Sequence, residues 1–110
     1  MVIPNAHRAV VDMAKLLDYC LSSTHPRGRH KARVFAATLG LTAEHASHLR
    51  EALLDAARER DAVPTERDDY GQRYMVDFMM RGPSGRARIR STWIVRCGED
   101  FPRLTSCYVL

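Results

Sequence analysis

The sequence has no apolar run that approaches the roughly 18 residues of a membrane-spanning helix. Near the N-terminus, polar side chains interrupt the apolar residues, so this segment lacks the hydrophobic centre of a secretory signal peptide. The interrupting residues are His7, Arg8, Asp12 and Lys15. These absences predict a cytoplasmic protein that does not enter a membrane.

Cysteine is scarce, and the usual metal-binding and nucleotide-binding motifs are missing. The three cysteines are Cys20, Cys97 and Cys107, and none belongs to a Cys-x-x-Cys pair, which disfavours a zinc site and a disulfide framework. His45 and His48 have a spacing that can chelate a metal, but no third ligand lies in register with them. There is no glycine-rich nucleotide loop, HExxH, DxD or GxSxG motif. We therefore expect reduced thiols, no metal and no other cofactor.

Acidic residues are absent from two windows of the chain, residues 19–43 and 78–98, although the chain contains 13 of them. The two windows hold 9 of the 17 Lys and Arg residues. If the fold brings the windows together, they form an anion-binding surface. The alternative is that each basic run is only a solvated face.

The first half of the chain has helical periodicity. Apolar spacing predicts helices over about residues 6–21, 30–39 and 42–60, with Gly40 ending the second helix and Thr42 capping the third. We therefore expect residues 1–61 to form a helical half.

The second half has the alternating pattern of strands over about residues 70–80, 86–96 and 103–109. Four turn-forming residues, Gly82 to Gly85, predict a hairpin, and residues 64–69 are expected to be a polar connector. The sequence thus predicts a single α+β domain over residues 1–110. Three helices pack on one face of a three-stranded antiparallel meander formed by residues 67–110, and the other face is open to solvent or a partner.

The middle strand divides into an apolar face and a basic face. Ala87, Ile89, Ser91, Trp93 and Val95 alternate with Arg86, Arg88, Arg90, Thr92 and Arg96. We expect Trp93 to lie in the core, because it shares a face with Ile89 and Val95. Arg88, Arg90 and Thr92 are spaced so that they can straddle one phosphate, or they are charges that discourage edge pairing.

Two further segments carry candidate site residues. The His25-Pro26-Arg27-Gly28 turn precedes a predicted helix, where backbone N–H groups favour an anion and an imidazole can exchange protons near neutral pH. It is alternatively a basic loop whose Pro and Gly only form the turn. In the last strand, alternation places Leu104, Ser106 and Tyr108 on one face, so that two hydroxyl groups could orient a phosphate or Tyr108 could belong to the core.

The segments together resemble a family of small bacterial domains of unknown function, found alone and at the C-termini of phage-head-like and toxin-like proteins. The resemblance covers nearly the whole chain and identifies a family rather than an activity. Its motifs here are the Leu/Tyr-rich segment Leu16 to Leu21, His25-Pro26-Arg27-Gly28-Arg29-His30-Lys31-Ala32, Gly40, Tyr70-Gly71-Gln72-Arg73-Tyr74, Gly82-Pro83-Ser84-Gly85-Arg86, Arg90-Ser91-Thr92-Trp93 and Pro102-Arg103-Leu104 with Ser106 and Tyr108.

More loosely, helices followed by a small sheet resemble the metal-independent ribonuclease toxins of the barnase, colicin and RelE type. That resemblance implies a catalytic site made of His25, Lys31, Arg90, Ser106 and Tyr108. Ser106 stands where the threonine of the pattern is expected, and Val109 stands where a proline is expected. The first departure keeps the hydroxyl group, whereas the second leaves the end of the last strand undetermined.

The resulting hypothesis is a small ribonuclease-like domain that acts on RNA. His25 would deprotonate the ribose 2′-hydroxyl, Lys31 and Arg90 would stabilise phosphate charge, and Tyr108 with Ser106 would orient the phosphate. Additional contacts to nucleic acid are expected from Arg27, Arg29, Arg86 and Arg88. The alternative is a non-catalytic module that binds nucleic acid or an acidic protein such as an immunity protein or antitoxin.

Overall fold

In the computed structural model, residues 1–110 are described, and the strands form one antiparallel sheet with the order β1-β2-β3-β4. The strands are β1 (Val63–Asp68), β2 (Gly71–Gly82), β3 (Gly85–Arg96) and β4 (Pro102–Val109). The helices are α1 (Met13–Lys15), α2 (Arg29–Leu39) and α3 (Ala46–Glu59). The predicted α+β class is confirmed, but the sheet has four strands rather than three.

The predicted continuous helix over residues 6–21 is wrong. The structure has a 3₁₀ turn, Ala6–Arg8, then extended residues, then α1, which continues as a π-helical turn over Leu16–Cys20 (the π turn). The extended residues pair with β4, because the Val10 N–H donates to the Pro102 carbonyl at 2.9 Å and the Leu104 N–H donates to the Val10 carbonyl at 3.0 Å. This pairing covers part of an otherwise open sheet edge, so it outweighs the helical pattern.

The second and third helices form as predicted. Gly40 ends α2 in the left-handed conformation with φ of 70°, and its N–H donates to the Ala36 carbonyl. Thr42 caps the 3₁₀ turn Ala43–His45 that leads into α3, and the Thr42 N–H donates to His45 Nδ1 at 3.1 Å. None of the helices combines the length and the apolar character needed to cross a bilayer.

The expected polar connector at residues 64–69 is instead part of β1, so the sheet begins at Val63 rather than at residue 67. This strand pairs with β2, with Val63 opposite Met75 and Asp68 opposite Gly71. All six residues of β1 are exposed, so neither of its faces is buried and the sequence shows no alternation. A charged, Pro-bearing edge strand of this kind discourages pairing with another chain.

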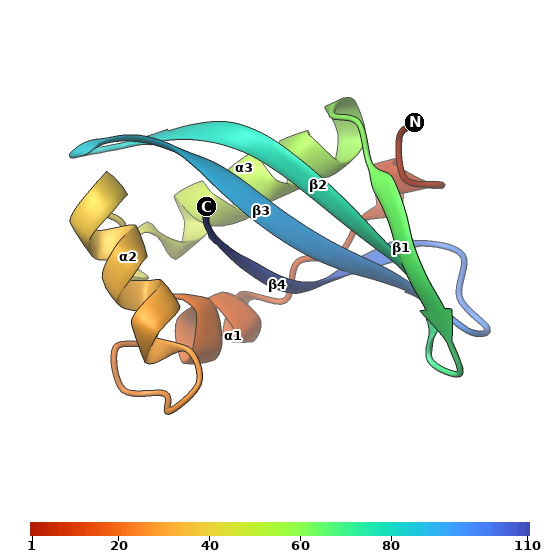
Figure 1. The fold of residues 1–110 in the computed structure, drawn as a ribbon, viewed down its shortest axis with the longest axis horizontal. Coiled ribbons are helices and arrows are strands. Elements are labelled where there is room, and N and C mark those ends of the chain that lie inside the picture. Colours follow the sequence, from red (N-terminus) through yellow and green to blue (C-terminus); the bar gives the residue numbers. More distant parts are fainter.

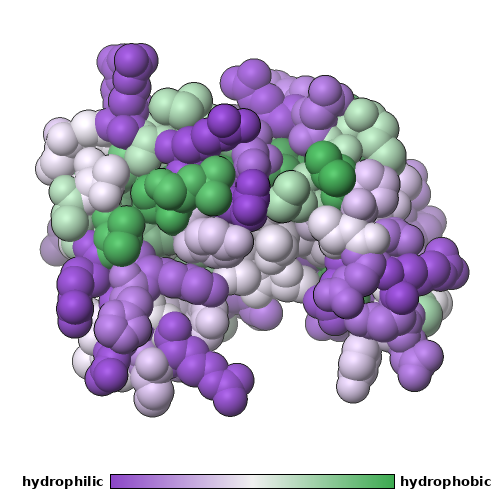
Figure 2. Space-filling view, viewed as in Figure 1, coloured by the Kyte–Doolittle hydropathy of each residue, from purple (hydrophilic) through white to green (hydrophobic).

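The helices cover one face of the sheet, and Figure 1 views the sheet from its open face, with α3 behind β2 and β3. The core lies between the two layers and contains Phe35 of α2, Leu49 and Leu53 of α3, and Ile89 and Trp93 of β3, all with no exposed surface. The predicted alternation of β3 and the predicted burial of Trp93 are therefore confirmed. Figure 2, in the same orientation, shows apolar patches over the strands among hydrophilic side chains.

A bulge changes which side chains of β4 share a face. Thr92 lies opposite Ser106 while its neighbour Trp93 lies opposite Leu104, so Thr105 is the additional residue. Leu104 and Cys107 are buried on the core side, whereas Ser106 and Tyr108 pair with Thr92 and Arg90 of the open face. The expectation that Leu104 shares a face with Ser106 and Tyr108 is thus wrong, because simple alternation does not reveal a bulge.

The buried polar groups of the core satisfy one another. Ser91 donates its hydroxyl hydrogen to the Val76 carbonyl at 2.8 Å and accepts the indole N–H of Trp93 at 2.9 Å.

Ser91→Ala should lower the free energy of unfolding by about 1–3 kcal/mol, because it leaves a buried N–H donor without an acceptor. Urea unfolding followed by circular dichroism measures the change. Ser47→Ala, at an exposed position of α3, is the control and should change it by less than about 0.5 kcal/mol; equal effects would contradict the assignment.

Candidate functional site

Lys31 connects α2 with the π turn that precedes it and with β4, which is far away in the sequence. It extends from the first turn of α2 to β4, where Nζ donates to Ser106 Oγ at 3.3 Å. The same nitrogen lies 5.0 Å from the centre of the Tyr108 ring and 5.5 Å from that of Tyr19, at the end of the π turn. Both distances are within the range of cation–π attraction. The structure thus brings together three predicted site residues, Lys31, Ser106 and Tyr108.

This cluster has more hydrogen-bond donors than acceptors. An ammonium group only donates, so Ser106 Oγ accepts from Lys31 and its own hydroxyl hydrogen remains available, as do further N–H groups of Lys31. Lys31 forms no ion pair with an acid. A half-buried group of unpaired donors suits an oxyanion such as a phosphate, which accepts several hydrogen bonds at once.

His25 lies beside this cluster but does not touch Lys31 directly. Its ring packs edge-on against Tyr19, with the ring centres 4.8 Å apart, so His25 and Lys31 both contact the Tyr19 ring. His25 Nδ1 accepts the backbone N–H groups of Arg27 at 3.0 Å and Gly28 at 3.1 Å. These two bonds assign the proton of the neutral ring to Nε2. In this arrangement His25 presents an N–H donor, and its predicted role as general base requires the turn to release Nδ1.

The turn depends on Gly28 for a close approach. A Cβ atom at position 28 would overlap the carbonyl oxygen of Tyr19, so only glycine allows this contact. The His-Pro-x-Gly motif therefore has a structural role, because it packs the turn that opens α2 against the backbone of the π turn.

Arg90 lies in the same row of the open face as Tyr108, its partner in the β3–β4 pairing. Its guanidinium donates two hydrogen bonds of 2.9 Å to Asp77 of β2. These bonds lower the pKa of Asp77 against the opposing effect of burial, and they raise the pKa of Arg90. Arg90 is therefore present at the predicted site, but Asp77 balances its charge.

The residues predicted to contact nucleic acid, Arg27, Arg29, Arg86 and Arg88, are all exposed and none forms an ion pair. Arg86 pairs with Arg81 across the β2–β3 ladder, so two cations on the open face face each other. Like charges in this position are destabilising unless an anion lies near them. The two acid-free windows meet at the end of α2, where the Ser84 N–H donates to the Leu39 carbonyl at 3.0 Å. Lys31, in the first window, also contacts Tyr108, the strand partner of Arg90.

Sequence reasoning missed three residues of this region. Tyr19 contacts both His25 and Lys31, Asp77 pairs with Arg90, and Thr105 Oγ1 lies 2.6 Å from Thr92 Oγ1 beside Ser106. A signal existed for Asp77, since it is the only acid in the alternating pattern of β2. For Tyr19 the only signal was the Leu/Tyr-rich segment of the family resemblance, which gave it no role. No signal existed for Thr105, because its position depends on a bulge.

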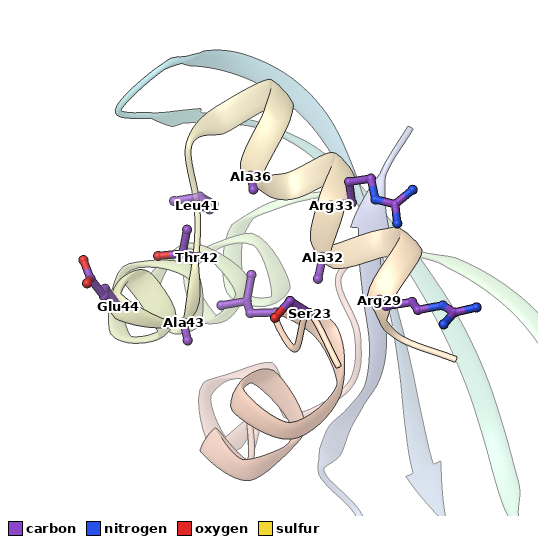
Figure 3. A pocket seen from close by; sticks show the side chains of 10 residues that line it. Ser23, Arg29, Ala32, Arg33, Ala36, Leu41, Thr42, Ala43 and Glu44 are labelled. Carbon is purple, nitrogen blue, oxygen red and sulfur yellow. The ribbon is translucent and has the colours of Figure 1, made fainter. Parts of the chain in front are cut away.

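A separate cavity of about 640 Å³ lies between α2 and the segment that leads into α3. Small side chains form much of its lining, among them Ala32, Ala36 and Ala43. Figure 3 shows the guanidinium groups of Arg29 and Arg33 pointing away from the segment 41–44. The cavity thus has no convergent set of charged groups, and we assign it no ligand.

Comparison with known proteins gives a family and a fold. The model of the family described as "Domain of unknown function (DUF6883)" matches residues 2–110, which confirms the expected kind of family. The chain is also similar to a chain of the contact-dependent growth inhibition toxin–immunity protein complex from Klebsiella pneumoniae 342, with a TM-score of 0.71 and 20% sequence identity. That alignment covers 90% of this chain and 97% of the other, and at this identity it shows a shared fold. No curated protein matches the chain.

The contact at Gly28 can be tested by adding one methyl group. Gly28→Ala should lower the free energy of unfolding by about 1–3 kcal/mol, because backbone atoms must move to admit the Cβ atom. Urea unfolding measures the loss of stability. Gly98→Ala is unsuitable as a control, because Gly98 has a φ of 84°, a conformation that favours glycine over alanine. Ser23→Ala, at an exposed position just before the turn, is the control and should change stability little. A fully stable Gly28→Ala protein would contradict the close approach.

The Asp77–Arg90 pair should make stability depend on pH. Because the folded-state pKa of Asp77 is lowered, its contribution is fully present above its unfolded pKa of about 4 and is lost as the pH falls through the lower folded pKa. Asp77→Asn should therefore be less stable than wild type at neutral pH, and the difference should shrink below about pH 4. Urea midpoints across this range measure it, with Asp55→Asn on the exposed face of α3 as control. A deficit that stays constant with pH would contradict the assignment.

Proposed function

The chain belongs to the DUF6883 family of domains of unknown function, and we propose that it is a toxin-type ribonuclease domain that binds an RNA phosphodiester at Lys31. The observation that carries the proposal is the hydrogen bond from Lys31 to Ser106, residues separated by 75 positions in the sequence. It places an unpaired ammonium group between two tyrosine rings and beside a free hydroxyl donor. The shared fold with a chain from a toxin–immunity complex supports the toxin-type assignment.

The proposed chemistry is attack of the ribose 2′-hydroxyl oxygen on the adjacent phosphorus. The bond from phosphorus to the 5′-oxygen of the next nucleotide breaks, which leaves a 2′,3′-cyclic phosphate and a 5′-hydroxyl that takes up the proton released from the 2′-hydroxyl. The nucleophile belongs to the substrate, so the protein's part is to position the phosphate and stabilise its developing charge, and a metal is not required. Lys31 and Ser106 would donate to the non-bridging oxygens, and Tyr108 would orient the phosphate from the same strand. His25 Nε2–H would donate a further hydrogen bond, and the ring becomes a base only when the turn releases Nδ1.

Arginines of β3 would hold the rest of the RNA strand. Alternate residues of a strand lie about 7 Å apart on one face, so Arg86, Arg88 and Arg90 form a row that leads from the β2–β3 turn towards Tyr108. Arg27 and Arg29 would contact the strand from the other side of Lys31. Because phosphate contacts of this kind carry no base information, we expect weak sequence preference.

A second candidate function, non-catalytic binding of nucleic acid or an acidic protein, is favoured by one specific observation. His25, the histidine predicted to be the base, uses Nδ1 to hold its own turn together, so it offers a donor rather than a free base. In that case the same donors bind an anionic partner, such as an immunity protein or antitoxin, without cleaving it.

Cleavage of single-stranded RNA in the presence of a metal chelator tests the proposal. Lys31→Gln should lower the cleavage rate by about 10²-fold or more, because it removes charge stabilisation at the phosphate. Lys15→Gln removes the only other lysine and is the matched control, which should keep the wild-type rate. If wild type cuts RNA no faster than Lys31→Gln, the nuclease assignment is wrong.

RNA-binding measurements on two further variants, His25→Ala and Arg88→Ala, separate the two candidate functions. A binding module retains RNA affinity after His25→Ala, loses it after Arg88→Ala and binds more weakly as salt increases. A nuclease loses cleavage after His25→Ala even where binding remains. Binding that resists both salt and Arg88→Ala would contradict the use of the arginine face in either function.

A further inference from the structure

The open face of the β2–β3 hairpin carries three cations that lie outside the site at Lys31. Arg81 of β2 lies directly opposite Arg86 of β3, and Arg88 follows two residues later on the same face. All three are exposed, and none forms an ion pair. The hairpin lies at the end of the sheet beside α2, away from β1 (Figure 1). We call Arg81, Arg86 and Arg88 the hairpin cluster.

The pairing of the strands determines how closely Arg81 and Arg86 approach each other. The Leu110 N–H donates to the Arg88 carbonyl at 2.9 Å, so the backbone polar groups of Arg88 point away from β2. Those of Arg86, two residues earlier, point to the same side. Arg81 and Arg86 therefore form a non-hydrogen-bonded pair, in which the Cα atoms are about 4.5 Å apart and the side chains are closest. The backbone thus holds two guanidinium groups next to each other.

No carboxylate of the sheet balances this pair. Asp77 is the only acid of β2, and Arg90 already donates two hydrogen bonds of 2.9 Å to it. Two neighbouring cations with free N–H groups suit one anion that has several acceptor oxygens, and the fork of a guanidinium matches a phosphate in particular. A bound phosphate would also relieve the repulsion between Arg81 and Arg86.

An apolar side chain lies within the hairpin cluster. Met79 pairs with Arg88 on the open face and is 57% exposed, whereas its neighbours Phe78 and Met80 are buried in the core. A thioether makes favourable contacts with aromatic rings, and a nucleobase is such a ring. The bases of a single strand have accessible faces, whereas stacking covers those of a duplex. Phosphate donors around an apolar surface therefore fit a nucleotide of a single strand.

We infer that the hairpin cluster is a second phosphate site, which makes the domain selective for single-stranded RNA longer than a dinucleotide. Arg86 precedes Arg90 by four residues, so the cluster lies about 13 Å along β3 from the row that contains Tyr108. A dinucleotide has one phosphodiester and cannot occupy both places, whereas a longer strand can. The inference rests on the proposed function for the choice of RNA as the ligand.

Binding of an RNA that cannot be cleaved tests the cluster without relying on catalysis. The probe is a fluorescent single strand of about eight nucleotides with 2′-O-methyl groups, which lack the proposed nucleophile. Arg81→Gln with Arg86→Gln should raise the Kd about tenfold or more, because charge-assisted hydrogen bonds to a phosphate are lost. The slope of log affinity against log salt should become shallower by about 0.7, the value for one phosphate contact on a single strand.

The matched control removes the same charge elsewhere on the surface. Arg58→Gln with Arg67→Gln changes exposed positions of α3 and β1 that form no ion pair, and the Kd and the salt slope should stay at the wild-type values. If both double variants lose affinity equally, only net charge matters and the inference is wrong.

The contact with a base is tested separately at Met79. Met79→Gln should raise the Kd of the single strand about twofold to tenfold, because a sulfur–ring contact is lost, and should leave the salt slope unchanged. A duplex of the same sequence should bind more weakly and should not respond to Met79→Gln. A duplex that binds as tightly as the single strand would contradict the selectivity.

Cleavage distinguishes failure of this inference from failure of the proposed function. Arg81→Gln with Arg86→Gln should cut a dinucleotide at the wild-type rate, and on the long strand it should raise KM and leave kcat unchanged. If the wild type cuts no RNA but the variant still loses binding, the hairpin cluster is supported and the nuclease assignment is wrong. Binding of a polyglutamate peptide of equal charge as tightly as the RNA would overturn the inference, because it would indicate a protein partner.

Discussion

Burial of one face of β3 is the constraint on which the rest of the structure depends. Side chains of a strand alternate between faces, so burying Ile89, Ser91 and Trp93 against the helices turns Arg88 and Arg90 to the open side. A shift of one residue would expose the indole and bury guanidinium groups. The free-energy cost of burying these charges is far larger than the stabilisation that any surface interaction provides. The packing of the core therefore fixes the direction of the basic face, and only side chains outside the core are available to bind a ligand.

The part of the site that carries Lys31 is positioned by a backbone contact rather than by side-chain charge. Gly28 allows the turn before α2 to lie on the carbonyl of Tyr19, and His25 closes that turn by accepting two N–H groups. Because Lys31 follows in the first turn of α2, this contact decides where its ammonium group lies. The His-Pro-x-Gly motif, which was predicted to be part of a catalytic site, thus packs the start of α2 against the π turn.

Most of the fold could be predicted from the sequence, whereas its irregular parts could not. Alternation in β2 and β3 and the caps at Gly40 and Thr42 are local signals, and local geometry produced the expected elements. The strand β1 was not predicted, because it buries no side chain and so shows no alternation. The first helix was predicted too long, because Val10 pairs with β4. The meeting of Lys31 with Ser106 was implied only by resemblance, because it requires the π turn, the Gly28 contact and the bulge together.

The charges of the open face differ in how far they are free to bind a ligand. Arg90 is held in two hydrogen bonds by Asp77, so an incoming phosphate must compete with a carboxylate for it. Lys31 has only a neutral hydroxyl and two rings as partners, so a phosphate displaces nothing of like charge. An anion therefore reaches Lys31 at a lower cost than Arg90. Whether chemistry follows binding then depends on His25, since its Nδ1 must leave two backbone amides before the ring can accept a proton.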